Sequence, residues 1–442
     1  ASRSLRALLL IAALLLGSTV MSFRIASLEQ SILQDLYGDS VEVTAVVSTD
    51  AHALAPRVLG TQFAKQSYSA LVRVIEIKDG THTYRLRSPA RLISSEGDFK
   101  EILPGQIIRV QVLVQPSKEG RVAALLINKG SFTVVSQPSR WAKSLDRIRD
   151  GLRAASGTGD SGALIPGMVL GDTSLQSATF KNEMRRSGLT HLVAVSGANF
   201  AIVSTFILYL MQFIFRKIPL RLGATAIFLI AFIALVRPSP SVLRAAAMAA
   251  VLLIAQGTHR GRDSLPALGF AIAAVVVADP WQVRDPGFAL SVLATAGLLL
   301  FAPVIEKHLP THKKLAGALA PPIAAIVFCS PILVALSGYL SPISILANLL
   351  AAPFVAPITI VGFIAALVSP FAPALTSVLI FFIRVPAGAI AAIAHWSSEF
   401  PVLTIHNGMT GFAIVAVLVA FLWLFKKSWR RSTALLAVII LS

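Results

Sequence analysis

The 442-residue sequence contains a single cysteine, Cys329, which lies within an apolar run. One thiol forms neither a disulfide within the chain nor a multi-cysteine metal site, so both frameworks are excluded. Charged side chains are also few, at 14%, where soluble domains carry about a quarter. Since 55% of the residues are hydrophobic and the mean hydropathy is +0.75, the composition indicates a membrane protein.

Acidic residues are scarce as well, with 21 Asp and Glu against 39 Lys and Arg, which leaves a net charge of +18. Cytoplasmic loops of inner-membrane proteins are enriched in Lys and Arg, and we assign roughly two-thirds of the excess to that rule. The remainder leaves a nucleic-acid or anionic-lipid partner open. The sequence has no GxxxxGK[ST] loop, so it shows no sign of a P-loop nucleotide site.

Other metal and nucleophile patterns are weak. His308 and His312 are four residues apart, but Pro310 lies between them, so we expect no metal site there. Ser196 lacks the strand-turn-helix setting of a hydrolase nucleophile, and no acid that would orient His191 stands nearby. No cofactor is expected.

The chain begins with an apolar segment, Leu5–Phe23, that follows Arg3 and Arg6 and is long enough to span a bilayer. No small-x-small cleavage site follows it. We therefore expect residues 1–24 to form a retained transmembrane anchor with its N-terminus inside, rather than a cleaved signal peptide.

Residues 40–137 differ in character, with β-branched residues alternating at period two. Asp79-Gly80 and Pro104-Gly105 are turn signals. Five short strands in this length predict a small closed β-barrel of the OB type. The expected strands are Val41–Ser48, Tyr68–Ile77, Thr83–Leu92, Ile107–Val114 and Val122–Val135.

Basic and aromatic residues of this β domain predict a surface that follows phosphates and stacks on bases. An ordinary solvated strand face is the alternative. The residues concerned are Arg73, Arg85, Arg87, Arg91, Tyr68 and Tyr84.

Residues 138–188 predict helices at the membrane surface. Along Trp141–Leu152 apolar residues recur at helical spacing opposite Lys143, Arg147 and Arg149, which is typical of an amphipathic interfacial helix. Pro166–Ser187 is of mixed polarity and is expected to precede the first span of the bundle.

Residues 189–442 alternate apolar runs with short polar breaks. The fold class is therefore a polytopic α-helical membrane protein of about 10 or 11 spans with an N-terminal external β-barrel. Basic clusters in alternate loops place those loops in the cytoplasm. The expected spans are 191–215, 221–236, 242–257, 265–279, 288–304, 315–337, 343–368, 372–394 and 409–425, with a tenth run from Thr433.

Proline lies well inside several of these spans, where each one removes a helix hydrogen bond. Broken helices frame substrate paths in transporters, whereas prolines that serve only packing are the alternative. The residues are Pro321, Pro322, Pro331, Pro353, Pro357 and Pro386.

Polar residues at the mouths of apolar runs predict a path through the bundle. Unpaired polar groups in hydrocarbon cost several kcal/mol, so they face a packed interior or a water-filled path. Arg244 matches phosphate if it is buried, or snorkels if it is not, and Asp285 equally suits a helix N-cap. The predicted path residues are His191, Ser196, Gly197, Asn199, Arg244, Asp285, Ser291 and Asn348.

In this order, several segments resemble the ComEC/Rec2 family of competence proteins over roughly residues 160–400. They are Gly171-Asp-Thr-Ser174, Gly188-Leu-Thr-His191 through Val195-Ser-Gly197, Ser239-Pro-Ser-Val-Leu-Arg-Ala245, Asp279-Pro280 with Asp285-Pro-Gly-Phe288 and Leu290-Ser291, and Asn348-Leu-Leu350 with Pro353.

The resemblance implies an inner-membrane, multi-pass channel that imports single-stranded DNA during natural transformation and is not itself an enzyme. Implied partners are membrane lipid, an external DNA receptor, a nuclease and a cytoplasmic ATPase, with a second copy of the chain as a further candidate. Many relatives carry histidine where this chain has Asn199, and larger members have a metallo-β-lactamase-like domain whose His-rich motif is not found here.

Two other functions stay open. One is a secondary transporter of a small anionic or lipidic solute, with the proline-containing helices as its gate. The other is an intramembrane hydrolase that uses Ser196 and His191.

Overall fold

A computed structural model of the chain describes residues 17–54, 58–59, 62–63, 66–80, 82–193, 195–237, 240–257 and 264–424. The chain divides into two compact units, residues 1–145 (unit 1) and 146–442 (unit 2). Residues 17–29 form a helix, whereas most of the expected anchor and the whole run from Thr433 lie outside the described residues.

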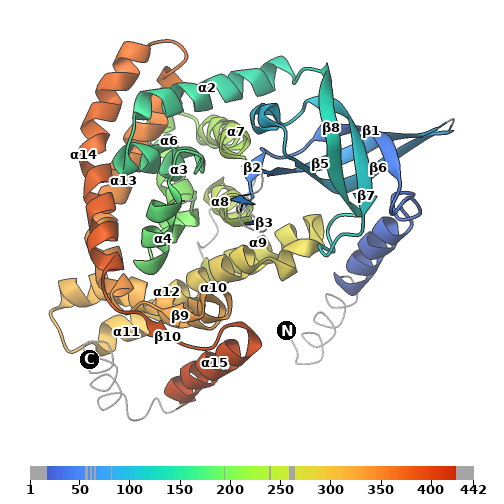
Figure 1. The fold of residues 1–442 in the computed structure, drawn as a ribbon. Coiled ribbons are helices and arrows are strands. Elements are labelled where there is room, and N and C mark those ends of the chain that lie inside the picture. The colour runs from blue at the N-terminus through green and yellow to red at the C-terminus, as the bar shows by residue number, and fades with distance from the viewer. Residues whose placement is uncertain are drawn as a thin grey trace. The chain divides into compact units, whose positions relative to one another are not determined.

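Unit 1 forms strands where alternation predicts them (Figure 1). Gly80 and Gly105, in the two predicted turns, have φ of +52° and +89°, a region that glycine adopts without steric penalty. The strands are β1 (Ser40–Val47), β5 (Tyr68–Asp79), β6 (His82–Ser94), β7 (Ile107–Gln115) and β8 (Ala124–Ser136), with the short β2 (His52–Ala53), β3 (Val58–Leu59) and β4 (Gln62–Phe63).

One sheet holds the main strands in the order β1-β7-β8-β6-β5-β2, and β1 also pairs with β5. All neighbours are antiparallel except β6 and β8, which are parallel. The inward residues of every main strand, such as Val43, Val72, Leu92, Val110 and Leu126, are fully buried and share one core. Unit 1 therefore has a core of its own.

The expected closed barrel needs correction. β6 and β8 pair only from Ala90 to Ile93 against Ala124 to Ile127, and both strands continue well beyond that register. The strands thus curl around the core, but the seam between β6 and β8 is short, and the sheet is not a closed barrel.

Unit 2 is helical. Its elements are α2 (Arg140–Ser156, which begins in unit 1), α3 (Asp160–Leu170), α4 (Ala178–Arg186), α5 (Thr190–Val193), α6 (Gly197–Ile214), α7 (Ile218–Val236), α8 (Pro240–Gly257), α9 (Ser264–Ala278), η2 (Pro280–Arg284), α10 (Pro286–Leu300), α11 (Ala302–His308), α12 (Lys313–Ser337), α13 (Ser344–Val368), α14 (Pro373–Ser398) and α15 (Gly408–Leu424). A short β9 (Tyr339–Leu340) pairs with β10 (Leu403–Thr404).

Five described helices, α6, α7, α12, α13 and α14, are long and apolar enough to cross a membrane. α10 and α11 meet at a bend of 45° and make a sixth candidate if they count as one span. Each expected segment of the bundle from 191 to 425 is helical, but the described apolar parts of α8, α9 and α15 fall short of a full span. Of the nine spans expected between 191 and 425, five or six are therefore long and apolar enough among the described residues.

Proline does not break the long helices. Each of α12, α13 and α14 runs as one helix through its prolines. The bend lies instead between α10 and α11, where the backbone leaves α10 at Phe301. A span can lose one backbone hydrogen bond at a proline and stay helical when neighbouring helices support it. A sharp change of direction needs a break in the helix.

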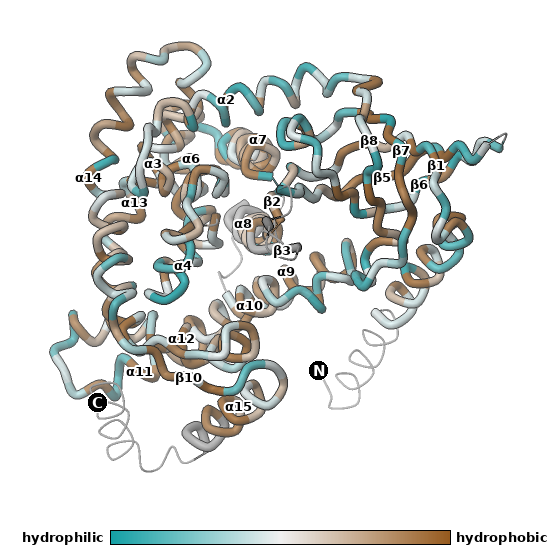
Figure 2. Tube along the Cα trace, viewed as in Figure 1, coloured by the Kyte–Doolittle hydropathy of each residue, from teal (hydrophilic) through white to brown (hydrophobic). Residues whose placement is uncertain are grey.

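α13 and α14 form an antiparallel pair joined by a short turn (Figure 1). On α14, Ile383 and Ala387 are buried, while Phe381, Phe382 and Val385 are exposed. Apolar residues dominate α13, α14 and α15, in contrast to α4 (Figure 2). Nearby in the unit, Cys329 of α12 is buried and its thiol donates to the carbonyl of Leu290 on α10 at 3.4 Å.

Candidate functional site

The start of α6 gathers three of the predicted path residues. Ser196 is the N-cap, and its Oγ accepts the backbone N–H of Asn199 at 3.1 Å. The Asn199 side chain is buried, and its Nδ2 donates to the carbonyl of Met168 on α3 at 3.0 Å. Its Oδ1 has no hydrogen-bond partner. The amide therefore anchors the first turn of α6 to α3 and does not line an open wall.

Arg244 of α8 lies against the same turn. A Cβ placed on Gly197 would come within 2.7 Å of its Nη2, so the guanidinium occupies the space that a side chain at Gly197 would fill. Only 4% of Arg244 is exposed, and its Nε and Nη1 have no hydrogen-bond partner. Arg244 is therefore buried and does not snorkel. Ser196, Gly197, Asn199 and Arg244 form the set that we call the α6 cluster.

The turn before α5 packs on α13. Gly188 has φ of +74°, and a Cβ there would collide with the Cβ of Ser344 at the start of α13. Asn348 lies one turn further along α13, and its Nδ2 donates to the carbonyl of Ser344 at 2.7 Å. His191 of α5 is exposed. The glycine thus permits a close approach of two motif segments that lie far apart in the sequence.

The remaining path residues lie on α10. Asp285 is the N-cap of this helix, with its Oδ1 accepting the N–H of Phe288 at 3.0 Å, as the cap interpretation predicts. Ser291 is half-buried, and its carbonyl accepts the Thr295 hydroxyl at 2.9 Å. The hydrogen bonds of Asp285 and Ser291 seen among the described residues stay within α10 and the turn before it.

A hollow of about 570 Å³ lies beside α4. Its lining includes Thr173 of the Gly171–Ser174 segment together with Thr190 and Val193 of α5. Lys181 and Arg185 of α4 add positive charge. Two of the motif segments therefore share one surface, which basic residues border.

Arg149 of α2 is buried rather than on the polar face expected for an interfacial helix. Its Nη1 donates to the carbonyls of Leu170 at 3.2 Å and Leu235 at 3.0 Å, which end α3 and α7. Helix C-termini leave carbonyls without partners and carry partial negative charge, so one guanidinium serves two helix ends. This requirement overrides the amphipathic pattern at Arg149.

Asp172, in the Gly171–Ser174 segment, balances this charge. Its Oδ2 accepts Nε of Arg153 at 3.0 Å and lies 3.7 Å from Nη2 of Arg149, while its Oδ1 accepts the N–H of Ser174 at 3.0 Å. Burial by itself raises the pKa of Asp172, but the hydrogen bonds from Ser174 and Arg153 outweigh it and bring the pKa to about 2. Asp172 is therefore a fixed anion.

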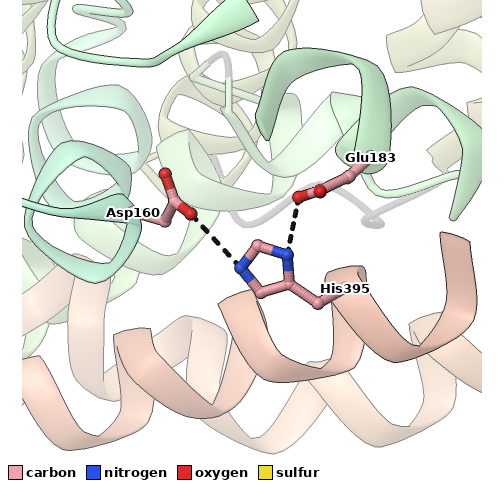
Figure 3. Close-up of side chains that lie close together, drawn as sticks. All are labelled: Asp160, Glu183 and His395. Atoms are coloured by element: carbon pink, nitrogen blue, oxygen red, sulfur yellow. Dashed lines mark ion pairs between the residues drawn. The ribbon is translucent and has the colours of Figure 1, made fainter. Parts of the chain in front are cut away.

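His395, near the end of α14, lies between two carboxylates, Asp160 of α3 and Glu183 of α4 (Figure 3). Nε2 of His395 is 3.2 Å from Oδ2 of Asp160, and Nδ1 is 2.6 Å from Oε2 of Glu183. The three side chains come from elements widely separated in sequence, and all are at least partly exposed.

We expect no metal ion between these three side chains. Each carboxylate faces a different ring nitrogen, and the two nitrogens project from opposite edges of the imidazole (Figure 3). A protonated imidazole donates from both nitrogens at once. The donor types suit Zn²⁺, and one ligand atom from each residue lies within 4.8 Å of the other two.

Comparison with known proteins assigns unit 2 to a family. A family model described as "Competence protein" matches residues 168–432, more than half of the chain. The chain belongs to this competence protein family. The matched residues include the α6 cluster, Asp285, Ser291 and Asn348, whereas unit 1 and α2 lie outside them.

One curated relative of this competence-family chain is "ComE operon protein 3" of Bacillus subtilis (strain 168). The two are 25% identical over 203 residues, which cover 44% of this chain and 25% of that protein. The match thus spans about a quarter of the relative's length. No solved structure matches the chain.

The basic surface predicted on unit 1 is present only in part. Arg73, Arg85 and Arg87 are exposed on the neighbouring strands β5 and β6. Arg91 is paired, with its Nε 2.7 Å from Glu119, and so is not free to follow phosphates.

The predicted stacking residues of unit 1 face the other way. Tyr68 and Tyr84 pack against the core because strand alternation turns position 84 away from the face of Arg85. Both predicted stacking residues thus pack largely against the core.

No sequence pattern indicates the three residues around His395. Asp160, Glu183 and His395 stand singly, each far from the others in sequence, and no spacing rule links them. The available signal was weak, namely a titratable residue directly after a predicted span, as His395 is.

Proposed function

We propose that this competence-family chain takes part in natural transformation by passing one strand of DNA across the cytoplasmic membrane. The family match supports a role in transformation, and it covers all the candidate spans found among the described residues. The observation that carries the proposal is Arg244, a guanidinium buried inside an apolar bundle with two nitrogens free of partners. A polyanion that passes through supplies the counter-charge.

Unit 1 supplies the capture surface in this proposal. Arg73, Arg85 and Arg87 form an exposed basic row on two adjacent strands, and such rows bind nucleic-acid backbones through their phosphates. With the N-terminus inside and one N-terminal crossing, unit 1 lies outside the membrane. An external receptor, a nuclease and a cytoplasmic ATPase are the partners that such a route needs, and membrane lipid surrounds the helices.

The test is recovery of labelled transforming DNA from the cytoplasm of a transformable host. The strains compared are a deletion of this gene, the deletion complemented with the wild type, and the deletion complemented with Arg85→Glu/Arg87→Glu. We expect the deletion to bind DNA outside and to import none, and the double variant to import less in a salt-dependent way.

The same assay separates the other functions. Persistence of import in the deletion strain sinks the channel and favours the transporter of a small anionic or lipidic solute. Loss of all function on Ser196→Ala, with normal folding and no change in DNA binding, favours the hydrolase.

A further inference from the structure

The start of α6 carries two independent signs of an anionic ligand. The first is the helix end, because N–H groups of the first turn have no partners inside the helix and the helix dipole makes this end positive. Ser196 accepts the N–H of Asn199, while the N–H groups of Gly197 and Ala198 point out of the helix end. α6 is 18 residues long, so its dipole contributes at this end.

The second sign is the buried guanidinium of Arg244. It lies against Gly197, the first residue of α6, as the 2.7 Å from Nη2 to the missing Cβ shows. Its Nε and Nη1 have no partner although the side chain is almost fully buried. A buried cation beside the positive end of a helix is repelled and desolvated, and an anion between the two removes both penalties.

We infer that Arg244 and the first turn of α6 form a phosphate-binding site whose ligand is the phosphodiester backbone of the DNA strand. A guanidinium fork pairs with two phosphate oxygens, and helix N-termini bind phosphate through backbone N–H groups. This inference rests on the proposed function and adds to it the group that touches the strand. Since phosphates carry no sequence information, such a contact lets a strand of any sequence pass.

Two other members of the α6 cluster shape this site. Gly197 leaves room for the fork, because a Cβ there would come within 2.7 Å of Nη2 and the guanidinium would have to shift. Asn199 holds the turn in place through its bond to Met168. Gly197→Ala is therefore expected to impair the site with Arg244 still present.

The binding test uses the full chain in phosphatidylcholine nanodiscs, in the Arg85→Glu/Arg87→Glu background so that unit 1 contributes less. The melting temperature is followed with inorganic phosphate, with a 12-nucleotide oligothymidylate, or with chloride at equal ionic strength. We expect phosphate and oligothymidylate to stabilise the protein, because they bind the native state. Arg244→Met is expected to abolish this shift, and Arg244→Lys, which keeps the charge without the fork, to leave part of it.

The matched control is Arg284→Met, since Arg284 is an exposed arginine elsewhere in unit 2. It is expected to behave as the parent. If Arg244→Met fails to fold, Gly197→Ala takes its place. An oligothymidylate shift that survives in Gly197→Ala, and in Arg244→Met where that variant folds, overturns the site.

The source of the phosphate is decided by one further arm, with phosphatidylglycerol added to the nanodiscs. Stabilisation by that lipid alone, dependent on Arg244 and without any response to oligothymidylate, makes the ligand a lipid headgroup and overturns the DNA contact. In cells, Arg244→Met is expected to lower import about tenfold or more while surface-bound DNA is unchanged. Import that is normal in the deletion strain refutes the proposed function but leaves Arg244-dependent binding standing, so the two failures are distinguishable.

Discussion

The carboxylate of Asp172 is the counter-ion for two arginines that approach it from α2. It is 6% exposed, and so is Arg149. Removing one member of a buried pair leaves the other charge uncompensated, so Asp172→Asn is expected to cost roughly 3–5 kcal/mol. Thermal unfolding of the detergent-purified protein measures this loss. A neutral outcome would show that water or lipid headgroups replace the carboxylate.

The pH dependence of the Asp172 contribution follows from its pKa of about 2. A carboxyl group whose folded-state pKa lies below its ordinary value near 4 stabilises the fold fully above pH 4 and loses that contribution as the pH falls through 2. The stability difference between the wild type and Asp172→Asn is therefore expected to be constant from pH 7 to pH 5 and to shrink only below about pH 4. A difference that already shrinks between pH 7 and pH 5 contradicts this assignment.

His395 allows a test of proton against metal. With Asp160 and Glu183 on opposite ring edges, a chelator is expected to leave the melting temperature unchanged. Glu183→Gln is expected to speed amide hydrogen exchange in the last turns of α14, because it removes an anchor of that helix end.

Ser377→Ala, at an exposed hydroxyl near the start of the same helix, is the control for Glu183→Gln. A chelator-induced loss of stability that Zn²⁺ restores would overturn the proton assignment and establish a metal centre.

The two faces of α14 predict opposite responses to truncation. Ile383 is 2% exposed and its neighbour Phe382 is 65% exposed. Ile383→Ala is expected to cost about 2–5 kcal/mol through lost packing. Phe382→Ala is expected to cost little, because lipid tails replace the contacts of the ring. Unfolding in nanodiscs tests the pair, and an equal loss at Phe382 would mark that face as an interface with another chain.

Sequence patterns predict the helices and strands well where one periodicity dominates. The five main strands of unit 1 agree with the alternation within about two residues at each end. Prediction failed where tertiary contacts determine whether a side chain is buried. The helical spacing of Arg149 places it among solvated charges, but the carbonyls at two helix ends hold it in the interior. For the prolines the sequence leaves a broken helix and simple packing open, and α12 to α14 are continuous through them.

The candidate site was predictable in its members but not in its grouping. Arg244 and Asn199 stand out in the sequence as polar residues in apolar surroundings, and the fold places both at the first turn of α6. Asp285 was chosen on the same ground but serves as a cap. Polarity in an apolar run indicates that a group needs a partner, but only the fold shows which partner it has.

The ends of α7 and α13 constrain the membrane topology of the whole chain. Arg149 of α2 donates to the carbonyl of Leu235 at the end of α7. The hydroxyl of Ser369, at the end of α13, donates at 3.2 Å to the carbonyl of Ile148, which precedes Arg149 in α2. Both helix ends thus lie beside one stretch of α2. Strict alternation along the expected spans would instead put them on opposite sides of a membrane. We therefore expect α8 to α13 to cross an even number of times, for example through α12 and α13 alone.

Cysteine labelling from the two sides of the membrane tests this topology. We expect Ser239→Cys, Phe371→Cys and Thr311→Cys all to react from the same side, with α10 and α11 as a re-entrant pair. The contrary result is that Thr311→Cys reacts from the other side while Phe371→Cys still reacts from the side of Ser239→Cys. The bent pair would then be a full span. Another helix between α8 and α13 would then have to turn back within the membrane.

Cys329 gives the chain one more property. Its thiol is packed between α12 and α10 and shares its hydrogen with the carbonyl of Leu290. We therefore expect a water-soluble maleimide or spin label not to react with this native cysteine. The wild-type protein then serves as the unlabelled control for site-directed probes. Pairs of introduced cysteines can then report distances between chosen sites without prior removal of a native cysteine.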